Sequence, residues 1–298
     1  MLRFRWEWCV LCCVVLTGRA AGQQDFSDVR IEVTPVAGNV YMLEGRGGNI
    51  GASVGADGIL IVDDQFAALA ERIRAALKEV NPGELQFVLN THWHSDHTGG
   101  NRVFGTEATI IAHTNVRGRL STPQTVRGKA VEPSPIEALP VITFDESLSI
   151  HFNGEEIRVI HFPHGHTDGD SVVFFMGSNV VHMGDTFFAG RFPFVDLSSG
   201  GDVEGLTRNI QTVIDRLGAD AKIIPGHGPL STLADLKAYC AMLKETTAIV
   251  RKRIDEGMTL EQVRTVGLNS KWEKWGAGFI TTEQWLETVY KSLTSKTK

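Results

Sequence analysis

The stretch His92-Trp93-His94-Ser95-Asp96-His97 places three imidazoles and one carboxylate within six residues. It follows the apolar residues 87–90 and precedes Gly99-Gly100, a context that predicts a strand ending in a loop. Because alternate side chains of a strand point to one face, we expect His92 and His94 to point the same way while Asp96 and His97 turn toward a second point. Imidazole and carboxylate are ligands that zinc prefers. The motif therefore indicates half of each of two adjacent metal sites; a polar, histidine-rich loop without metal is the alternative.

Three later segments also end an apolar run in a histidine or an aspartate. Residues 157–160 lead into Pro163-His164-Gly165-His166-Thr167-Asp168-Gly169-Asp170, residues 180–183 lead to Asp185, and residues 223–225 lead to His227. Taken singly, such an aspartate is more often a turn residue or a helix cap, and such a histidine is often a loop residue. Taken in this order after the first motif, they supply enough ligands for two metals. Spacing alone does not decide between His164 and His166.

His92-x-His94-x-Asp96-His97, followed by His166, Asp185 and His227, resembles the metallo-β-lactamase superfamily of metallohydrolases. The resemblance covers about residues 31–229. It implies that one metal is bound by His92, His94 and His166, that a second is bound by Asp96, His97 and His227, and that Asp185 bridges the two. The sequence His-Thr-x-Gly-Asp that begins at His166 resembles the third motif of the family and favours His166 over His164.

The bridging position distinguishes branches of this family. True β-lactamases usually have Cys or Ser where this chain has Asp185. The aspartate resembles that of glyoxalase II-like thioesterases, lactonases, phosphodiesterases and nucleases. The resemblance therefore implies a hydrolase for which a β-lactam is not the expected native substrate.

The hydrophobic pattern predicts two similar halves. The first is expected to contain strands at 40–43, 49–54, 58–62, 87–90 and 109–112, a helix over 66–80 and a short helix after Thr114. The second is expected to contain strands at 148–152, 157–162, 171–176, 179–183 and 222–224 and a helix over 203–217. Strands that end at ligands in both halves imply an α/β (α+β) fold, a four-layer αββα sandwich with the site at one sheet edge. The resemblance implies the same metallo-β-lactamase fold.

Residues 1–22 have the pattern of a secretory signal peptide. Arg3 and Arg5 precede a short apolar run at 9–16, and Ala20-Ala21-Gly22 supplies small residues for cleavage. The run is too short to span a bilayer; an uncleaved anchor or a wrongly assigned start is the alternative. We therefore expect a periplasmic or secreted chain of residues 23–298, with one metallo-β-lactamase-like domain and a C-terminal helical extension from about residue 230. It would have no stable membrane insertion after cleavage.

Removal of residues 1–22 would leave Cys240 as the single cysteine. The mature chain could then form no internal disulfide, so its stability would depend on its core and its metals.

Two segments are candidates for lining a pocket. Residues 118–140 contain four prolines and few apolar residues, and we expect a long surface loop that either lines the pocket or only links the halves. Residues 272–279 are rich in tryptophan and glycine. Core packing is the favoured interpretation there, and capping of the pocket is the alternative.

Several other polar residues need separate assignment. His113, His151, His161 and His182 lie in or beside apolar runs and are expected to pack or to form hydrogen bonds. Asp63-Asp64 ends a predicted strand. One of these carboxylates could orient a ligand histidine through its second ring nitrogen, or it could be a turn residue.

Length and composition fit a globular enzyme and indicate no nucleic-acid partner. The 298 residues are 42% hydrophobic, the net charge is −6, and the longest basic cluster is Arg251-Lys252-Arg253. We therefore predict a binuclear hydrolase of ester, thioester, lactone or amide bonds in a small molecule. Two Zn²⁺ are expected, with Fe or Mn as alternatives, and Asp96 could orient the attacking water or take its proton. An iron-dependent oxygenase of sulfur compounds and a non-catalytic metal-binding periplasmic protein are the competing functions.

Overall fold

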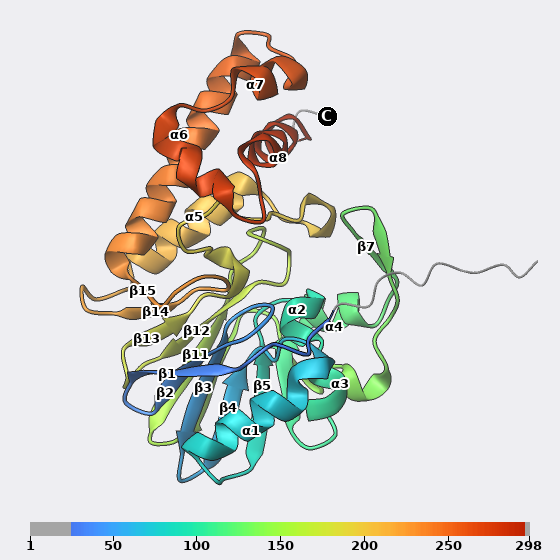
Figure 1. Cartoon of the computed structure of the whole chain (residues 1–298), viewed down its shortest axis with the longest axis vertical. Helices are drawn as coiled ribbons and strands as arrows, with labels where there is room; N and C mark the ends of the chain where they lie inside the picture. The colour runs from blue at the N-terminus through green and yellow to red at the C-terminus, as the bar shows by residue number, and fades with distance from the viewer. Residues whose placement is uncertain (1–24, 296–298) are drawn as a thin grey trace, which may run out of the picture.

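The computed structural model describes residues 25–295, so the predicted signal peptide lies outside the described residues. Two β-sheets pack face to face, and helices cover the outer face of each sheet (Figure 1). This arrangement is the four-layer αββα sandwich that the hydrophobic pattern predicts.

The first sheet has the strand order β1-β2-β3-β4-β5-β6-β9. Its strands are β1 (Glu32–Ala37), β2 (Val40–Glu44), β3 (Ile50–Gly55), β4 (Gly58–Val62), β5 (Leu85–Asn90), β6 (Thr109–His113) and β9 (Ile142–Phe144). Strands β1 to β4 pair antiparallel, whereas β4, β5, β6 and β9 run parallel. Parallel pairing brings the carboxyl ends of β4 and β5 to the same edge, where Asp63 and His92 follow them.

The second sheet has the order β10-β11-β12-β13-β14-β15. Its strands are β10 (Ser147–Phe152), β11 (Glu155–His161), β12 (Ser171–Phe175), β13 (Val180–His182), β14 (Lys222–Ile224) and β15 (Ser231–Thr232). β13 and β14 are parallel, so the segments that lead to Asp185 and His227 leave the sheet side by side. The predicted strands of both halves are therefore confirmed, while β1, β9 and β15 are additions.

Three apolar layers hold the sandwich together. Between the sheets, residues such as Leu60 and Leu89 pack against Val159 and Phe175. The 3-10 helix η1 (Ala67–Leu69) and the helices α1 (Ala70–Val80) and α3 (Asn101–Phe104) pack on the outer face of the first sheet. Two more short helices, α2 (Ser95–Thr98) and α4 (Thr114–Leu120), follow the ends of β5 and β6. Ile73 and Leu77 of α1 are buried against this sheet, as the predicted helix over 66–80 requires.

Two helices, α5 (Val203–Ile214) and α6 (Leu233–Asp255), cover the outer face of the second sheet. α8 (Thr282–Thr294) packs against α5 and α6, and α7 (Leu260–Val266) and the 3-10 helix η5 (Ser270–Ala277) contact α8. Two shorter 3-10 helices, η3 (Gly184–Thr186) and η4 (Leu197–Ser199), lie between β13 and α5 in the chain. Trp272 and Trp285 are buried in the same core, which confirms core packing for the first part of segment 272–279. Within the described residues, no helix combines the length and apolarity needed to cross a bilayer.

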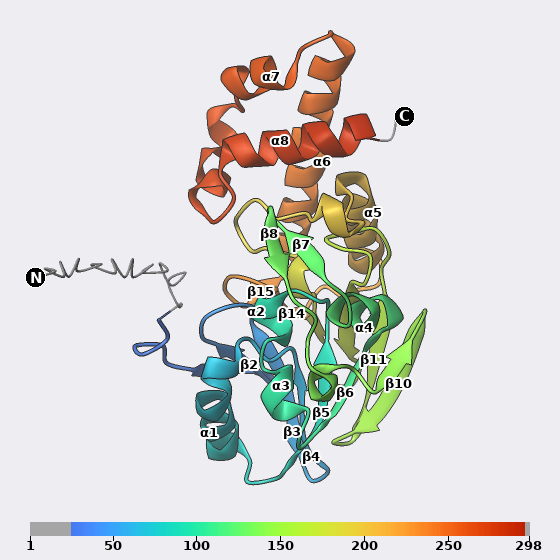
Figure 2. The same cartoon turned by 90° about the vertical axis from the view of Figure 1, so that its right-hand side faces the viewer.

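Residues 118–140 are more ordered than the predicted surface loop. After α4, the strands β7 (Gln124–Val126) and β8 (Lys129–Val131) form an antiparallel hairpin, and the 3-10 helix η2 (Ile136–Ala138) follows. The turn between the strands is Arg127-Gly128, with φ of 51° and 76°. Figure 2 shows the hairpin rising toward the C-terminal helices.

Candidate metal centre

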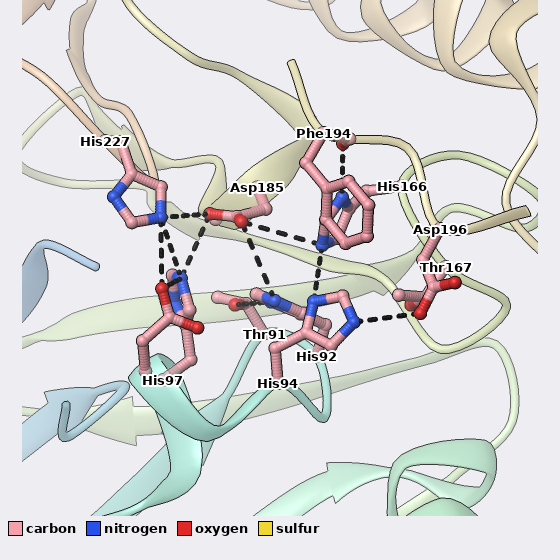
Figure 3. A network of polar contacts seen from close by, with 12 residues as sticks. Thr91, His92, His94, His97, His166, Thr167, Asp185, Phe194, Asp196 and His227 are labelled. Atoms are coloured by element: carbon pink, nitrogen blue, oxygen red, sulfur yellow. Dashed lines mark hydrogen bonds and ion pairs between the residues drawn. The ribbon is translucent and has the colours of Figure 1, made fainter. Parts of the chain in front are cut away.

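All seven predicted ligands meet at one edge of the sandwich. His92 and His94 follow β5, Asp96 and His97 lie on α2, and His166 lies in the loop between β11 and β12. Asp185 lies on η3 after β13, and His227 follows β14. The candidate ligands therefore come from the ends of several strands, and their side chains point toward one another (Figure 3).

The first cluster contains His92, His94, His166 and Asp185. One nitrogen or oxygen of each lies within 4.8 Å of the others, and all four side chains are buried. His94 Nδ1 lies 2.8 Å from His166 Nε2. Asp185 Oδ2 faces this cluster, 3.5 Å from His166 Nε2 and 3.9 Å from His92 Nε2.

The second cluster contains Asp96, His97 and His227, and Asp185 also reaches it. Asp185 Oδ1 lies 3.0 Å from His97 Nε2 and 3.3 Å from His227 Nε2. Asp96 Oδ2 lies 3.4 Å from His227 Nε2. The two carboxylate oxygens of Asp185 therefore face different clusters, which is the geometry that a bridging ligand requires.

A hydrogen-bond chain orients two of the imidazoles. Asp63 Oδ2 accepts from His97 Nδ1 at 2.7 Å and from the hydroxyl of Thr91 at 2.7 Å. The Thr91 oxygen lies 3.0 Å from His92 Nδ1 and can accept its proton. Asp63 therefore turns Nε2 of both His97 and His92 toward the clusters, as second partners of metal-binding imidazoles do.

Two further partners were missed by the sequence prediction. Asp196 Oδ2 accepts from His94 Nε2 at 3.1 Å, which leaves His94 Nδ1 facing the first cluster. The backbone oxygen of Phe194 accepts from His166 Nδ1 at 2.7 Å. Asp196 is itself held by the hydroxyl of Ser199 at 2.7 Å.

Burial and neighbouring charges shift histidine pKa values in opposite directions in the two clusters. Burial lowers the pKa of His92 well below its usual value and lowers that of His166 to about 4. Burial opposes protonation of His227 and His97 too, but the neighbouring carboxylates, Asp185 foremost, outweigh it. They raise the pKa of His97 well above its usual value and that of His227 to about 9. The neutral imidazoles of His92 and His166 offer the lone pairs that a metal needs.

The residues present fit a metal pair. Nε2 of His92 is buried and, among the residues that the structure describes, no group forms a hydrogen bond with it. A buried nitrogen without a hydrogen-bond partner destabilises the folded state. A cation bound between these carboxylate and imidazole groups would remove that cost. A Cβ on Gly48 would lie 2.0 Å from the His97 ring, and one on Gly226 would lie 2.2 Å from Asp185 Oδ1. Glycine at these positions leaves the room that the ligands need.

The competing histidines lie elsewhere. His164 is exposed, with φ of 52°, and does not join either cluster. His182 is buried and contacts the backbone oxygen of Asn49, while His113 and His161 stack with ring centroids 3.7 Å apart. These three pack and hydrogen-bond as expected, whereas His151 lies exposed on β10, which the prediction did not anticipate.

A cavity of about 710 Å³ opens over the centre. His94, Asp96, Asp185 and His227 form part of its wall, together with the hairpin residues Val126–Arg127 and the side chain of Phe279. Segment 118–140 therefore lines the pocket. Segment 272–279 serves both predicted purposes, because Trp272 is buried in the core and Phe279 faces the cavity with 64% of its surface exposed.

Curated relatives match parts of the chain. A hydroxyacylglutathione hydrolase of Gloeobacter violaceus is 33% identical over 138 residues, 45% of this chain and 44% of the relative. Hydroxyacylglutathione hydrolase GloC of Haemophilus influenzae is 30% identical over 176 residues, 56% of this chain and 80% of the relative. The chain thus spans less than half of the first relative and most of the second.

Solved structures share the fold at low sequence identity. A metallo-beta-lactamase from Pontibacter korlensis superposes with a TM-score of 0.60 at 17% identity, over 72% of this chain and 99% of that one. The sec-alkylsulfatase Pisa1 from Pseudomonas sp. superposes with a TM-score of 0.67 at 15% identity, over 88% of this chain and 50% of that one. The family model of the metallo-beta-lactamase superfamily matches residues 33–230, which include all seven candidate ligands. With this match and this fold, the chain belongs to the metallo-beta-lactamase superfamily.

Proposed function

We propose that the protein is a binuclear metal-dependent hydrolase that cleaves an ester, thioester, lactone or amide bond in a small molecule. The observation that carries the proposal is the placement of Asp185, whose two oxygens face two separate histidine clusters at the floor of a 710 Å³ cavity. Relatives named hydroxyacylglutathione hydrolase support cleavage of an acyl bond. The aspartate at position 185 favours such substrates over β-lactams.

The assigned ligands are His92, His94 and His166 for one metal, Asp96, His97 and His227 for the other, and Asp185 for both. A dication pair held there would lower the pKa of water to about 7 and polarise a carbonyl oxygen. Asp96 is the ligand side chain most open to the cavity, with 33% of its surface exposed, so it is placed to orient a water or to accept its proton. Asp63 and Asp196 hold the imidazole rings in position.

The first test combines metal analysis with a substrate panel. Purified protein loaded separately with zinc, iron and manganese is expected to bind about two ions per chain and to hydrolyse a chromogenic ester, thioester or lactone. The panel includes a β-lactam, for which we expect weaker turnover. A protein with iron alone that consumes oxygen and hydrolyses nothing would instead be an oxygenase, and one that binds metal without any turnover would be a binding protein.

We also propose that the protein is exported, on the basis of the residue pattern at 1–22. Amino-terminal sequencing of protein from the native host is expected to begin near Gln23, in a periplasmic or extracellular fraction. A mature chain that begins at Met1 would contradict export, and it would leave the proposed hydrolase activity unaffected.

A further inference from the structure

The cavity wall carries positive charge that the candidate ligands do not explain. Arg102, Arg127, Lys129 and Arg191 all line the cavity. None of these four side chains forms an ion pair or a side-chain hydrogen bond with another residue of the described part of the chain. Apart from the candidate ligands, Glu132 is the acidic side chain in the wall. Basic side chains that converge on a cavity without acidic partners raise the local concentration of anions.

Arg127 lies close to the first cluster, with one aromatic ring between them. Its guanidinium carbon lies 4.5 Å from the ring centre of Phe279 and 6.0 Å from that of Phe194. The Phe194 ring lies 5.7 Å from the rings of both His94 and His166. Arg127 also occupies a left-handed turn position, φ 51°, that arginine seldom adopts. Contact with the two aromatic rings holds this side chain at the cavity despite the unfavourable backbone.

Arg191 lies close to the second cluster. A Cβ placed on Gly228, the residue after His227, would lie 3.5 Å from Arg191 Nη2. A Cβ placed on Gly278 would lie 3.2 Å from Arg191 Cβ. Gly278 and Phe279 are consecutive, so a single C-terminal segment contacts both arginines. This segment lies outside residues 33–230, the part of the chain that matches the family model.

We propose that Arg127 and Arg191 select substrates that carry a carboxylate beside an apolar group. This inference rests on the proposed hydrolase function and adds the substrate class. The planar guanidinium donates two parallel hydrogen bonds to a carboxylate, which a neutral group of similar shape cannot match. The apolar part of the substrate would contact Phe66, Phe188 and Phe279, which line the same cavity.

Two matched substrates test the proposal. Both are 4-nitrophenyl esters of the same acyl chain with a phenyl branch; one ends in a carboxylate and the other in a primary amide. The metal-loaded protein is expected to prefer the carboxylate ester by about tenfold or more in kcat/KM, chiefly through KM. The preference should weaken as salt rises, because the arginines are partly open to solvent.

Substitution of the arginines identifies their role. Arg127→Gln and Arg191→Gln should each reduce the ratio of kcat/KM for the two esters, and Arg127→Lys should restore part of it. Arg208→Gln, which removes an exposed arginine of α5 outside the cavity, should keep the ratio of the unmodified protein. A ratio near one in the unmodified protein would overturn the proposal. So would a preference that survives in both variants, because the carboxylate would then bind the metals and not the arginines.

A binding measurement separates this inference from the proposed activity. Non-hydrolysable ether analogues of the two esters are titrated into the metal-loaded protein by calorimetry. If no ester is hydrolysed but the carboxylate analogue binds more tightly and loses this advantage in Arg127→Gln, the hydrolase proposal fails and the anion site stands. If both esters are hydrolysed equally and both analogues bind equally, the hydrolase stands and the anion site is wrong.

Discussion

Asp185 is the one side chain that faces both histidine clusters. Its Oδ2 faces His166 and its Oδ1 faces His97 and His227, and the side chain is 5% exposed. Without this carboxylate, each group of imidazoles would hold a dication with one negative charge fewer, in a site from which water is largely excluded. The loss of one side chain should therefore affect both metals.

Asp185→Ala is expected to bind less than one metal per chain and to lose at least about a thousandfold in kcat/KM. Elemental analysis after gel filtration and turnover of the preferred ester measure the two effects. Asp255→Ala, which removes an exposed carboxylate at the end of α6, is the matched control and should retain both properties. Retention of two metals and activity in Asp185→Ala would show that Asp185 is not the bridge.

His164 and His166 provide an internal comparison, because they are two residues apart and differ in burial. His166→Ala should lose the metal of the first cluster and most turnover, since its Nε2 faces His94 and Asp185. His164→Asn should retain both, because His164 is exposed and asparagine tolerates its left-handed backbone. Metal content and turnover of the two variants check this, and the opposite pattern would reassign the ligand to His164.

At the scale of elements, the strands that lead to candidate ligands were predictable, whereas β1, β9 and β15 at the sheet edges were not. β5, β13 and β14 each contain a buried apolar run, and such runs are visible in a sequence. β1 contains Pro35 and is largely half-exposed, and β9 has only three residues, two of them exposed. Their strand form depends on the neighbour that they pair with, not on their own hydrophobic pattern.

For the candidate site, the residues that could not be predicted are those whose role depends on contacts between distant segments. The seven candidate ligands could be selected from the sequence because each lies in a local motif, and the structure brings them together. Asp196 could not be selected, because its partner His94 is 102 residues away and Asp196 does not follow a predicted strand. The hairpin β7–β8 was missed for a different reason: its turn is Arg127-Gly128, whereas Asn-Gly or Asp-Gly is the recognised signal.

The C-terminal helices support the cavity, and Trp285 of α8 is central to that support. Its ring is fully buried, stacks on Phe192 with centroids 5.6 Å apart, and donates from Nε1 to Thr246 at 3.0 Å. Phe192 adjoins Arg191, so this packing also fixes one wall of the cavity.

Trp285→Ala is expected to lower the free energy of unfolding by about 3–5 kcal/mol, because it leaves a large cavity in the core and removes a buried hydrogen bond to Thr246. Urea unfolding of the metal-loaded protein measures the loss. Val266→Ala, at a side chain 59% exposed on α7, is the comparison and should change stability by less than about 0.5 kcal/mol. A similar small effect in both variants would mean that α8 contributes little to the fold.

At the scale of the whole molecule, two sheets contribute side chains to one candidate metal centre. His92 and His97 follow the first sheet, whereas His166, Asp185 and His227 come from the second. Metal binding should therefore hold the two halves together as well as support catalysis. The described residues contain one cysteine, Cys240, which is buried and unpaired, so no disulfide shares this role among them.

Removal of metal should consequently lower thermal stability, and a reductant should not. Ligand that binds only the folded state stabilises it by mass action, about 2.7 kcal/mol when metal is present at a hundred times its dissociation constant. For a chain of this size the melting temperature should fall by roughly 5–10 °C when a chelator is added. A phosphine reductant should leave it unchanged, and restoring zinc should reverse the chelator effect. If protein shown to have lost its metal melts at the original temperature, the centre does not tie the two sheets together. If the reductant lowers the melting temperature, a disulfide involving residues outside 25–295 or a second chain contributes to stability.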